Sequence, residues 1–186
     1  MKTLAMFLLL TLPAGLYAAG GEKTLKGVSL PLSIELNGKT LELNGMGLRT
    51  KIVFKVYVGG LYLEKPSRDG LAIASSEQVK CMELSFLRAV DGADVAKAIA
   101  EGFANNAGAS LPALKERIAR FGKLIPDVKK GDRLIFLYRP GTGLEVLANG
   151  KTAGTIEGKD FSDALFRVWL GEKPADKALK NGLLGV

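Results

Sequence analysis

The sequence contains no histidine and only one cysteine, Cys81. Without histidine, this chain alone cannot build a Ser-His-Asp triad, a Cys-His dyad, or a zinc or haem site that uses a histidine ligand. A single cysteine also excludes an intrachain disulfide and a metal site made of several cysteines. The composition therefore predicts no metal site and no cofactor, and it favours functions that need neither.

Acidic residues are outnumbered by basic ones, with 19 Asp and Glu against 26 Lys and Arg and a formal net charge of +7. The basic residues alternate with acidic ones, as in Lys115-Glu116-Arg117, and no stripe of basic and aromatic residues occurs. This pattern is typical of a solvated surface, so no nucleic-acid partner is predicted. An apolar fraction of 47% over 186 residues suits one folded domain with its own core.

The N-terminus is typical of a secretory signal peptide. Lys2 gives a basic start, an apolar run from Leu4 to Leu12 follows, and small residues around Ala18 suit a cleavage site. We expect residues 1–18 to be cleaved and residues 19–186 to form a single domain, with a cut after Gly20 as the alternative. A retained anchor is less favoured, because the apolar run is shorter than the roughly 20 residues that span a bilayer.

Export with a simple signal predicts a secreted, periplasmic protein. No later stretch is long and apolar enough to span a membrane, so no stable membrane span is expected after signal cleavage. Cys81 would be unpaired in an oxidising compartment, which favours a buried thiol over a redox site. The sequence does not identify any protein partner.

Alternating apolar residues predict a mostly antiparallel sheet. Asn37-Gly38 and Asn149-Gly150 are strong signals for two-residue hairpin turns. Gly45-Met46-Gly47 is expected to break the strand pattern, and Gly59-Gly60 to mark a bulge or a close approach. The predicted strands are Thr24–Val28, Leu32–Leu36, Lys39–Asn44, a long segment Arg49–Leu63, Val79–Leu87, Leu134–Tyr138, Leu144–Ala148 and Thr152–Ile156.

Capping residues and helical spacing predict four helices. Asp91, Ser110 and Asp160 are the expected N-caps of the first three, and each precedes apolar residues at helical spacing. The first helix is expected to end at Asn105–Gly108, the second starts after Ser110, the third covers Phe161–Leu170 and the last covers Pro174–Leu184. Strands, helices, further strands and a helical tail in this order predict an α+β fold.

Three polar residues in or near the long strand are candidates for a binding site. Arg49 follows the glycine-rich segment, where its cation either reaches solvent or projects into a cavity and attracts an anion. Tyr57 and Tyr62 are each expected in the core or at its rim. They face opposite sides of a regular strand, so only one of them need face a pocket, although a bulge at Gly59-Gly60 would reverse this.

One part of the sequence reads Gly45-Met-Gly-Leu-Arg-Thr-Lys-Ile-Val-Phe-Lys-Val-Tyr-Val-Gly-Gly-Leu-Tyr-Leu63. This run resembles the signature of the chalcone isomerase-like family, which is Gly-x-Gly-x-Arg before a strand that contains Val-Tyr-x-x-Gly-Leu-Tyr. Two later segments, the meander from Tyr138 to Phe161 and the run Trp169-Leu-Gly-Glu-Lys-Pro174, resemble the bacterial secreted branch of that family. The order and spacing of these segments hold across nearly the whole chain after the predicted signal peptide.

The resemblance implies an open-faced β-sandwich, in which a large antiparallel sheet curls under a layer of helices with a cleft between them. In plant members this cleft closes a chalcone into a flavanone, and in fatty-acid-binding relatives it holds an acyl chain. The family arginine, which contacts the acyl carboxylate, is matched by Arg49. The catalytic threonine of the plant enzymes falls at Tyr57, where the non-catalytic lipid-binding branch is similar in having tyrosine.

The other catalytic positions of the plant enzymes are not matched. Their helix tyrosine and asparagine fall near Asp94 and Glu101, and their late threonine or serine falls at Val168. Cyclisation requires several donors held in place together, so the loss of these groups argues against the enzyme. If the chain were an isomerase, Arg49 would be its one matched catalytic residue.

The leading hypothesis is a non-catalytic periplasmic protein that binds a fatty acid or another amphiphilic carboxylate, with Arg49 and Tyr57 as the ligand-binding residues. A chalcone-type isomerase, or an intramolecular lyase, is the alternative from the enzyme class. A haem or tetrapyrrole binder is a third hypothesis, although the iron would then need Tyr, Met or Cys as its ligand. A scaffold whose own side chains fill the cleft is the fourth.

Overall fold

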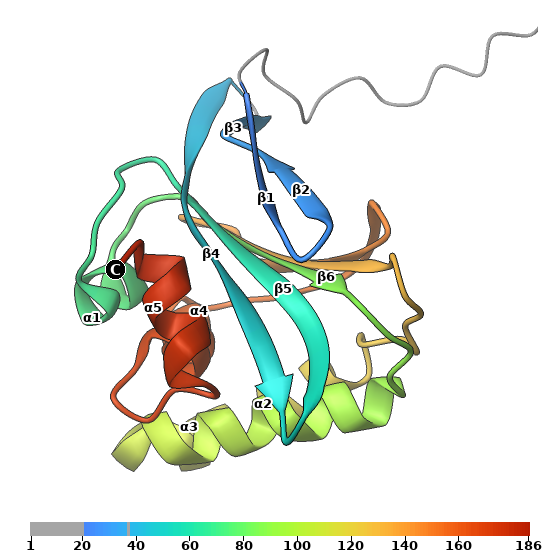
Figure 1. Ribbon diagram of the computed structural model, residues 1–186. Coiled ribbons are helices and arrows are strands. Elements are labelled where there is room, and N and C mark those ends of the chain that lie inside the picture. The colour runs from blue at the N-terminus through green and yellow to red at the C-terminus, as the bar shows by residue number, and fades with distance from the viewer. Residues whose placement is uncertain (1–20, 37) are drawn as a thin grey trace, which may run out of the picture.

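The computed structural model describes residues 21–36 and 38–186. Its centre is a seven-stranded antiparallel sheet with the strand order β3-β4-β5-β6-β7-β8-β9, next to a small hairpin of β1 and β2. Figure 1 shows that the large sheet curls. The strands are β1 Glu22–Leu25, β2 Val28–Pro31, β3 Ser33–Leu36, β4 Lys39–Lys51, β5 Phe54–Leu63, β6 Lys80–Phe86, β7 Arg133–Arg139, β8 Gly143–Ala148 and β9 Lys151–Ile156.

Helices cover one face of this sheet, and the β1–β2 hairpin covers the other. The larger core lies between the sheet and the helices, with Phe103, Phe161 and Trp169 among its buried side chains. A smaller core lies under the hairpin around Leu30 and Tyr62. This arrangement confirms the predicted α+β open-faced sandwich. The helices are α1 Gly70–Ser75, α2 Gly92–Asn106, the 3-10 turn Gly108–Ser110, α3 Leu111–Gly122, α4 Lys159–Leu170 and α5 Lys177–Leu184.

The expected strand break at Gly45-Met46-Gly47 is wrong, because β4 runs through this segment. Its glycines instead allow α5 to pack directly on the strand. A Cβ on Gly45 would lie 2.2 Å from the carbonyl oxygen of Gly182, and one on Gly182 would lie 2.4 Å from the carbonyl oxygen of Met46. These contacts hold α5 against the helix-covered face of β4.

The predicted long strand from Arg49 to Leu63 is two strands joined by a turn. Lys51 and Phe54 are cross-strand partners, so Ile52 and Val53 form a two-residue turn between β4 and β5. Ile52 and Val53 are β-branched residues typical of strands, so pattern analysis does not reveal this turn. The predicted strand Thr24–Val28 fails for a related reason, since Lys26 and Gly27 form the turn between β1 and β2.

Helix positions are predicted better than helix caps. Asp91 and Ser110 occupy their predicted N-cap positions, although neither side chain makes a capping hydrogen bond. Asp160 lies inside α4, whose N-cap is Gly158, because the Asp160 carboxylate pairs with Arg117 instead. The last helix begins at Lys177 rather than Pro174, capped by Asp176. The short helix α1, capped by the Asp69 carboxylate, was not predicted.

Away from the cleft, the helix-covered face is tightly packed around a buried lysine. The Lys80 ammonium donates to the carbonyl oxygens of Ile73, Ala74 and Ser76 at 3.2, 2.6 and 3.0 Å, at the end of α1. Burial lowers the pKa of Lys80 to about 8, although the nearby Asp163 carboxylate acts in the opposite direction. Cys81 is buried as predicted, and burial raises the pKa of its thiol.

Candidate ligand-binding cleft

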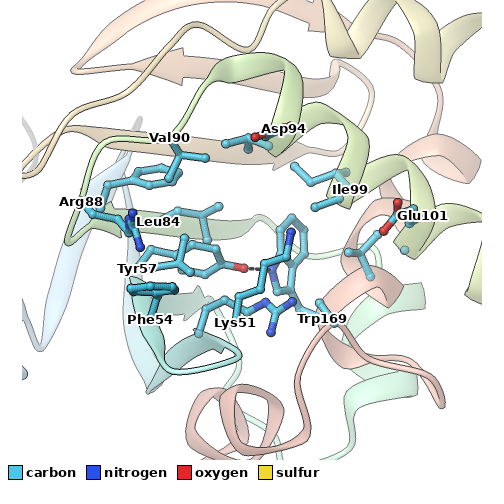
Figure 2. A pocket seen from close by; sticks show the side chains of 18 of the residues that line it. Lys51, Phe54, Tyr57, Leu84, Arg88, Val90, Asp94, Ile99, Glu101 and Trp169 are labelled. Carbon is cyan, nitrogen blue, oxygen red and sulfur yellow. Dashed lines mark hydrogen bonds between the residues drawn. The ribbon is translucent and has the colours of Figure 1, made fainter.

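A cleft of about 610 Å³ opens between the β4–β5 hairpin and helix α2. The strands β4, β5 and β6 form one wall, α2 forms the opposite wall, and the end of α4 closes the interior. Figure 2 shows Tyr57 and Trp169 inside, with Phe54 and Arg88 at one side and Ile99 and Glu101 at the other. Its volume is within the range of small-molecule sites.

Arg49 and Tyr57 both line this cleft because they are direct cross-strand partners on β4 and β5. Side chains of such a pair lie on the same face of the sheet, typically about 5 Å apart at Cβ. The pairing shifts immediately after this pair, from Arg49–Tyr57 to Thr50–Lys55, so Val56 is an extra residue on β5. A bulge of this kind bends the strand and redirects side chains at its end.

The predicted feature at Gly59-Gly60 is a close approach and not a bulge. The pairing of β5 with both neighbouring strands is regular there, and a Cβ on Gly60 would lie 2.3 Å from a side-chain methyl of Leu30. Tyr57 and Tyr62 therefore face opposite sides of the sheet. The hydroxyl of Tyr62 lies under the β1–β2 hairpin and donates to the carbonyl oxygen of Pro31 at 3.0 Å. Only Tyr57 faces the cleft.

The guanidinium of Arg49 is partly buried and held from one side. Its Nη1 donates to the carbonyl oxygen of Thr50 at 2.7 Å and to Oδ2 of Asp176 at 3.4 Å. The same carboxylate accepts from the backbone N–H of Thr50 and caps α5 through its other oxygen, which accepts from Leu179. Within residues 21–36 and 38–186, Nη2 and Nε of Arg49 have no hydrogen-bond partner, so this edge can bind a ligand.

Tyr57 is held by Trp169, the only tryptophan of the chain. The indole N–H of Trp169 donates to the Tyr57 hydroxyl at 3.0 Å, and Figure 2 marks this bond. The Tyr57 ring also packs edge-on against Phe86, with 5.6 Å between centroids. Burial raises the pKa of Tyr57 to about 12, which the Trp169 hydrogen bond and the charge of Arg49 only partly offset.

A phenol with this pKa is neutral at physiological pH and can donate a hydrogen bond. Its oxygen already accepts from Trp169, and no acceptor for its own proton occurs in the part of the chain that the structure describes. The remaining interior walls are mostly apolar and include Leu84, Phe86, Ile99 and Val168. The arrangement is therefore two polar donors, Arg49 and Tyr57, next to an apolar interior.

Three further residues considered in the sequence line the same cleft. Asp94 and Glu101 lie on the α2 wall and Val168 on α4. The positions compared with the plant enzymes thus face the cleft, but a valine and two carboxylates replace their hydroxyl and amide groups. Sequence reasoning missed the roles of Trp169 and Asp176. Trp169 belongs to a segment already noted for its resemblance, whereas no local pattern indicates that Asp176 reaches Arg49.

The described residues contain no group of three or more histidine, cysteine, aspartate or glutamate side chains placed to hold a metal ion. None of the helices formed by residues 21–36 and 38–186 is long and apolar enough to cross a membrane.

A curled antiparallel sheet with helices over one face and a cleft between them defines a chalcone isomerase-like fold. The chain belongs to the chalcone isomerase-like family, whose model matches residues 22–185. A solved structure with this fold is that of a fatty-acid binding protein from Arabidopsis thaliana. The two share 16% identity with a TM-score of 0.73, over 88% of this chain and 96% of that chain. A comparison with curated protein sequences found no match.

Proposed function

We propose that this protein binds a fatty acid or a similar amphiphilic carboxylate in the cleft, without catalysing a reaction on it. The observation that supports this most directly is the placement of Arg49 and Tyr57 side by side in a cleft whose interior walls are mostly apolar. The structural relative is itself a fatty-acid binding protein, which agrees with the proposal.

The carboxylate of the ligand would bind between the two donors. Its oxygens would accept from Nε and Nη2 of Arg49, a fork that matches carboxylate geometry, and from the neutral hydroxyl of Tyr57. Asp176 and Trp169 hold these two side chains from behind, through Nη1 of Arg49 and the oxygen of Tyr57. The ligand would therefore meet groups that are already oriented.

The acyl chain would lie along the apolar walls. Each methylene removed from water stabilises the complex by about 0.8 kcal/mol, so affinity should rise with chain length until the cleft is filled. The cleft is open at the β4–β5 hairpin, where Phe54 and Ile52 line it, and this opening would admit the chain.

The cleft lacks the groups that an isomerase would need at the compared positions. Val168 has no hydrogen-bonding group, and Asp94 and Glu101 present carboxylates where the plant enzymes have a tyrosine hydroxyl and an asparagine amide. Two donors remain, and they suffice to hold an anion but not to position both ends of a cyclising chalcone. We therefore favour binding over catalysis.

We also propose that the protein belongs to the secreted bacterial branch of the family and acts in the periplasm after loss of residues 1–18. The support is the basic, apolar and small-residue order of the N-terminus, which lies outside the described residues. The unpaired, buried Cys81 is compatible with that compartment because its thiol is shielded. N-terminal sequencing of the protein from a periplasmic extract tests the cut, and a protein that keeps residues 1–18 would contradict it.

Binding can be measured by calorimetry and by Trp169 fluorescence, since the single tryptophan lies in the cleft. The mature protein should bind long-chain fatty acids, and Arg49→Gln should weaken binding by about tenfold or more, because a charged hydrogen bond is lost. Arg88→Gln removes an equal charge from the cleft rim and is the matched control, with affinity nearly unchanged. Native mass spectrometry of freshly purified protein should show acyl chains that Arg49→Gln lacks.

The proposal fails if the wild-type protein carries no acyl chain and does not respond to added fatty acids. Turnover of a hydroxychalcone above the spontaneous rate, abolished by Arg49→Gln, would support the isomerase instead. A Soret band on addition of haem, together with no fatty-acid binding, would support the tetrapyrrole binder.

A further inference from the structure

The turn between β4 and β5 exposes three consecutive apolar residues. Ile52, Val53 and Phe54 are 87%, 76% and 54% exposed, and among the described residues they are the three most exposed large apolar side chains apart from Val186. Contiguous apolar surface of this kind commonly marks a site of contact with a protein or a membrane.

Turn chemistry does not explain these residues. Two other two-residue turns of the described residues use Lys26-Gly27 and Asn149-Gly150, with positive φ at both positions. Ile52 has a φ of 59°, a left-handed conformation that is unfavourable for a β-branched residue. Asparagine or glycine would form this turn at lower cost, so an apolar residue here points to a role outside folding.

Positive charge surrounds this exposed turn. Lys51 and Lys55 are exposed on either side of it, and the guanidinium of Arg88 lies 4.6 Å from the centre of the Phe54 ring. The acidic residues that line the cleft belong to the α2 wall: Asp91 precedes this helix, and Asp94 and Glu101 lie on it. Apolar side chains with cations at their base suit an anionic bilayer, where each nearby cation contributes about 1 kcal/mol.

The same residues form the opening of the cleft. Lys51, Ile52, Phe54 and Arg88 all line it, so a surface that contacts the turn also faces the cleft entrance. Figure 2 shows Phe54 and Arg88 at one side of the pocket, and Figure 1 shows the β4–β5 hairpin ending beside α2.

We propose that the β4–β5 turn inserts Ile52, Val53 and Phe54 into the interface of an anionic phospholipid bilayer. The cleft then takes up or releases its acyl ligand directly at the membrane, without passage of the chain through water. Docking rests on the turn itself, whereas the delivery of a ligand rests on the function proposed above.

The test uses vesicles of phosphatidylcholine alone and of phosphatidylcholine mixed with phosphatidylglycerol. The wild-type protein should co-sediment with the mixed vesicles, and added salt should weaken this binding. Ile52→Gly with Val53→Asn puts glycine at the one position of this turn that has a positive φ, so it should fold at least as well as the wild type. It should lose about tenfold or more in vesicle affinity, since two apolar side chains no longer enter the lipid.

Two control variants separate this turn from general surface properties. Leu32→Asn removes an exposed apolar residue near the other end of β4, and Lys23→Gln with Lys26→Gln removes two cations from the β1–β2 hairpin. Both should bind mixed vesicles like the wild type. Lys51→Gln with Lys55→Gln should weaken binding and reduce its salt dependence.

The outcomes distinguish docking from ligand binding. The turn variant should acquire fatty acid from mixed vesicles at least about tenfold more slowly than the wild type, a deficit larger than any change in its affinity for fatty acid in solution. Equal vesicle binding by the wild type and the turn variant, or none by either, overturns docking. Concentration-dependent dimerisation lost in the turn variant, without vesicle binding, would assign this surface to a second copy and also overturn it. Vesicle binding without any fatty-acid binding would refute the proposed function alone.

Discussion

The two faces of the central sheet place a tyrosine side chain in two different environments. Tyr57 and Tyr62 lie on one strand, and both are buried. Tyr62 is enclosed by the β1–β2 hairpin, where its hydroxyl donates to the carbonyl oxygen of Pro31. Tyr57 lies on the helix-covered face, where its hydroxyl accepts from Trp169 and faces a cleft of about 610 Å³.

The difference shows that the covering elements, and not the strand, decide whether a tyrosine becomes part of a site. The hairpin contacts its face closely, as the 2.3 Å separation between a Cβ at Gly60 and a methyl of Leu30 shows. The helices cover the other face unevenly. α5 lies directly on β4, while α2 leaves the cleft open.

The largest predicted effect comes from separating α5 from the sheet. Gly45→Ala would place a Cβ 2.2 Å from the carbonyl oxygen of Gly182, a backbone atom that cannot move alone. We expect a loss of about 3 kcal/mol in the free energy of unfolding, measured by urea denaturation. Asp176 at the start of α5 would shift as well, so fatty-acid affinity should fall in the same variant.

Gly122→Ala is the matched control. Gly122 is the last residue of helix α3, and a Cβ added there would lie 3.5 Å from the Cβ of Ala96, which is an ordinary contact. Stability should be unchanged or higher by up to about 1 kcal/mol, because alanine favours a helix over glycine. A Gly45→Ala protein as stable as Gly122→Ala would show that the approach of α5 does not need glycine.

The next largest predicted effect is a pH dependence of stability, which comes from the buried Lys80 on the helix-covered face. The pKa of Lys80 is about 8 in the folded protein against 10.5 for a free lysine, so the unfolded chain binds more protons between these values. Stability due to Lys80 should therefore rise with pH from about 8 to 10.5, with a slope of up to about 1.4 kcal/mol per pH unit.

Comparison with Lys80→Met isolates this contribution, because Cys81 and the tyrosines titrate in both proteins. The stability of the wild type relative to Lys80→Met should increase on going from pH 8 to pH 10 in urea denaturation. A difference that is constant over this range would mean that the three carbonyl oxygens at the end of α1 keep Lys80 fully charged.

The smallest effect separates the two tyrosines. Tyr62→Phe leaves the carbonyl oxygen of Pro31 without this partner, and we expect a loss of about 1–2 kcal/mol in stability. Fatty-acid affinity should be unchanged, because Tyr62 faces away from the cleft. Tyr57→Phe should lower the affinity a few-fold, as one neutral hydrogen bond to the carboxylate is lost, and should cost a similar amount of stability, because the buried indole N–H of Trp169 loses its acceptor. Urea denaturation measures the stabilities and calorimetry the affinities, and an affinity loss in Tyr62→Phe but not in Tyr57→Phe would contradict the assignment of the two faces.

Much of the fold follows from local pattern. The meander of β7, β8 and β9 was predicted almost to the residue, because alternating apolar residues and an Asn-Gly turn mark it. The turn at Ile52-Val53 was missed since its residues are those of a strand. The helix α1 was missed because its six residues carry too little periodicity. Its end is held by Lys80, which lies on the strand β6.

The candidate site was predicted in part. Arg49 and Tyr57 were selected from the resemblance, and the strand pairing places them together in the cleft. Trp169 and Asp176 come from segments more than 100 residues away along the chain, as the separations of 112 and 127 positions show. No pattern near Arg49 or Tyr57 could identify these contacts.

The sequence alone determined the chemistry that is absent and the order of most of the elements. Its lack of histidine excludes whole classes of site, and its apolar periodicity specifies strands and helices, because both depend only on residue type and spacing. The tertiary structure decided which face of β5 holds a cleft, and which donors of Arg49 and Tyr57 remain for a ligand. Those properties depend on how closely α2, α5 and the β1–β2 hairpin approach the sheet, and local spacing does not encode such distances.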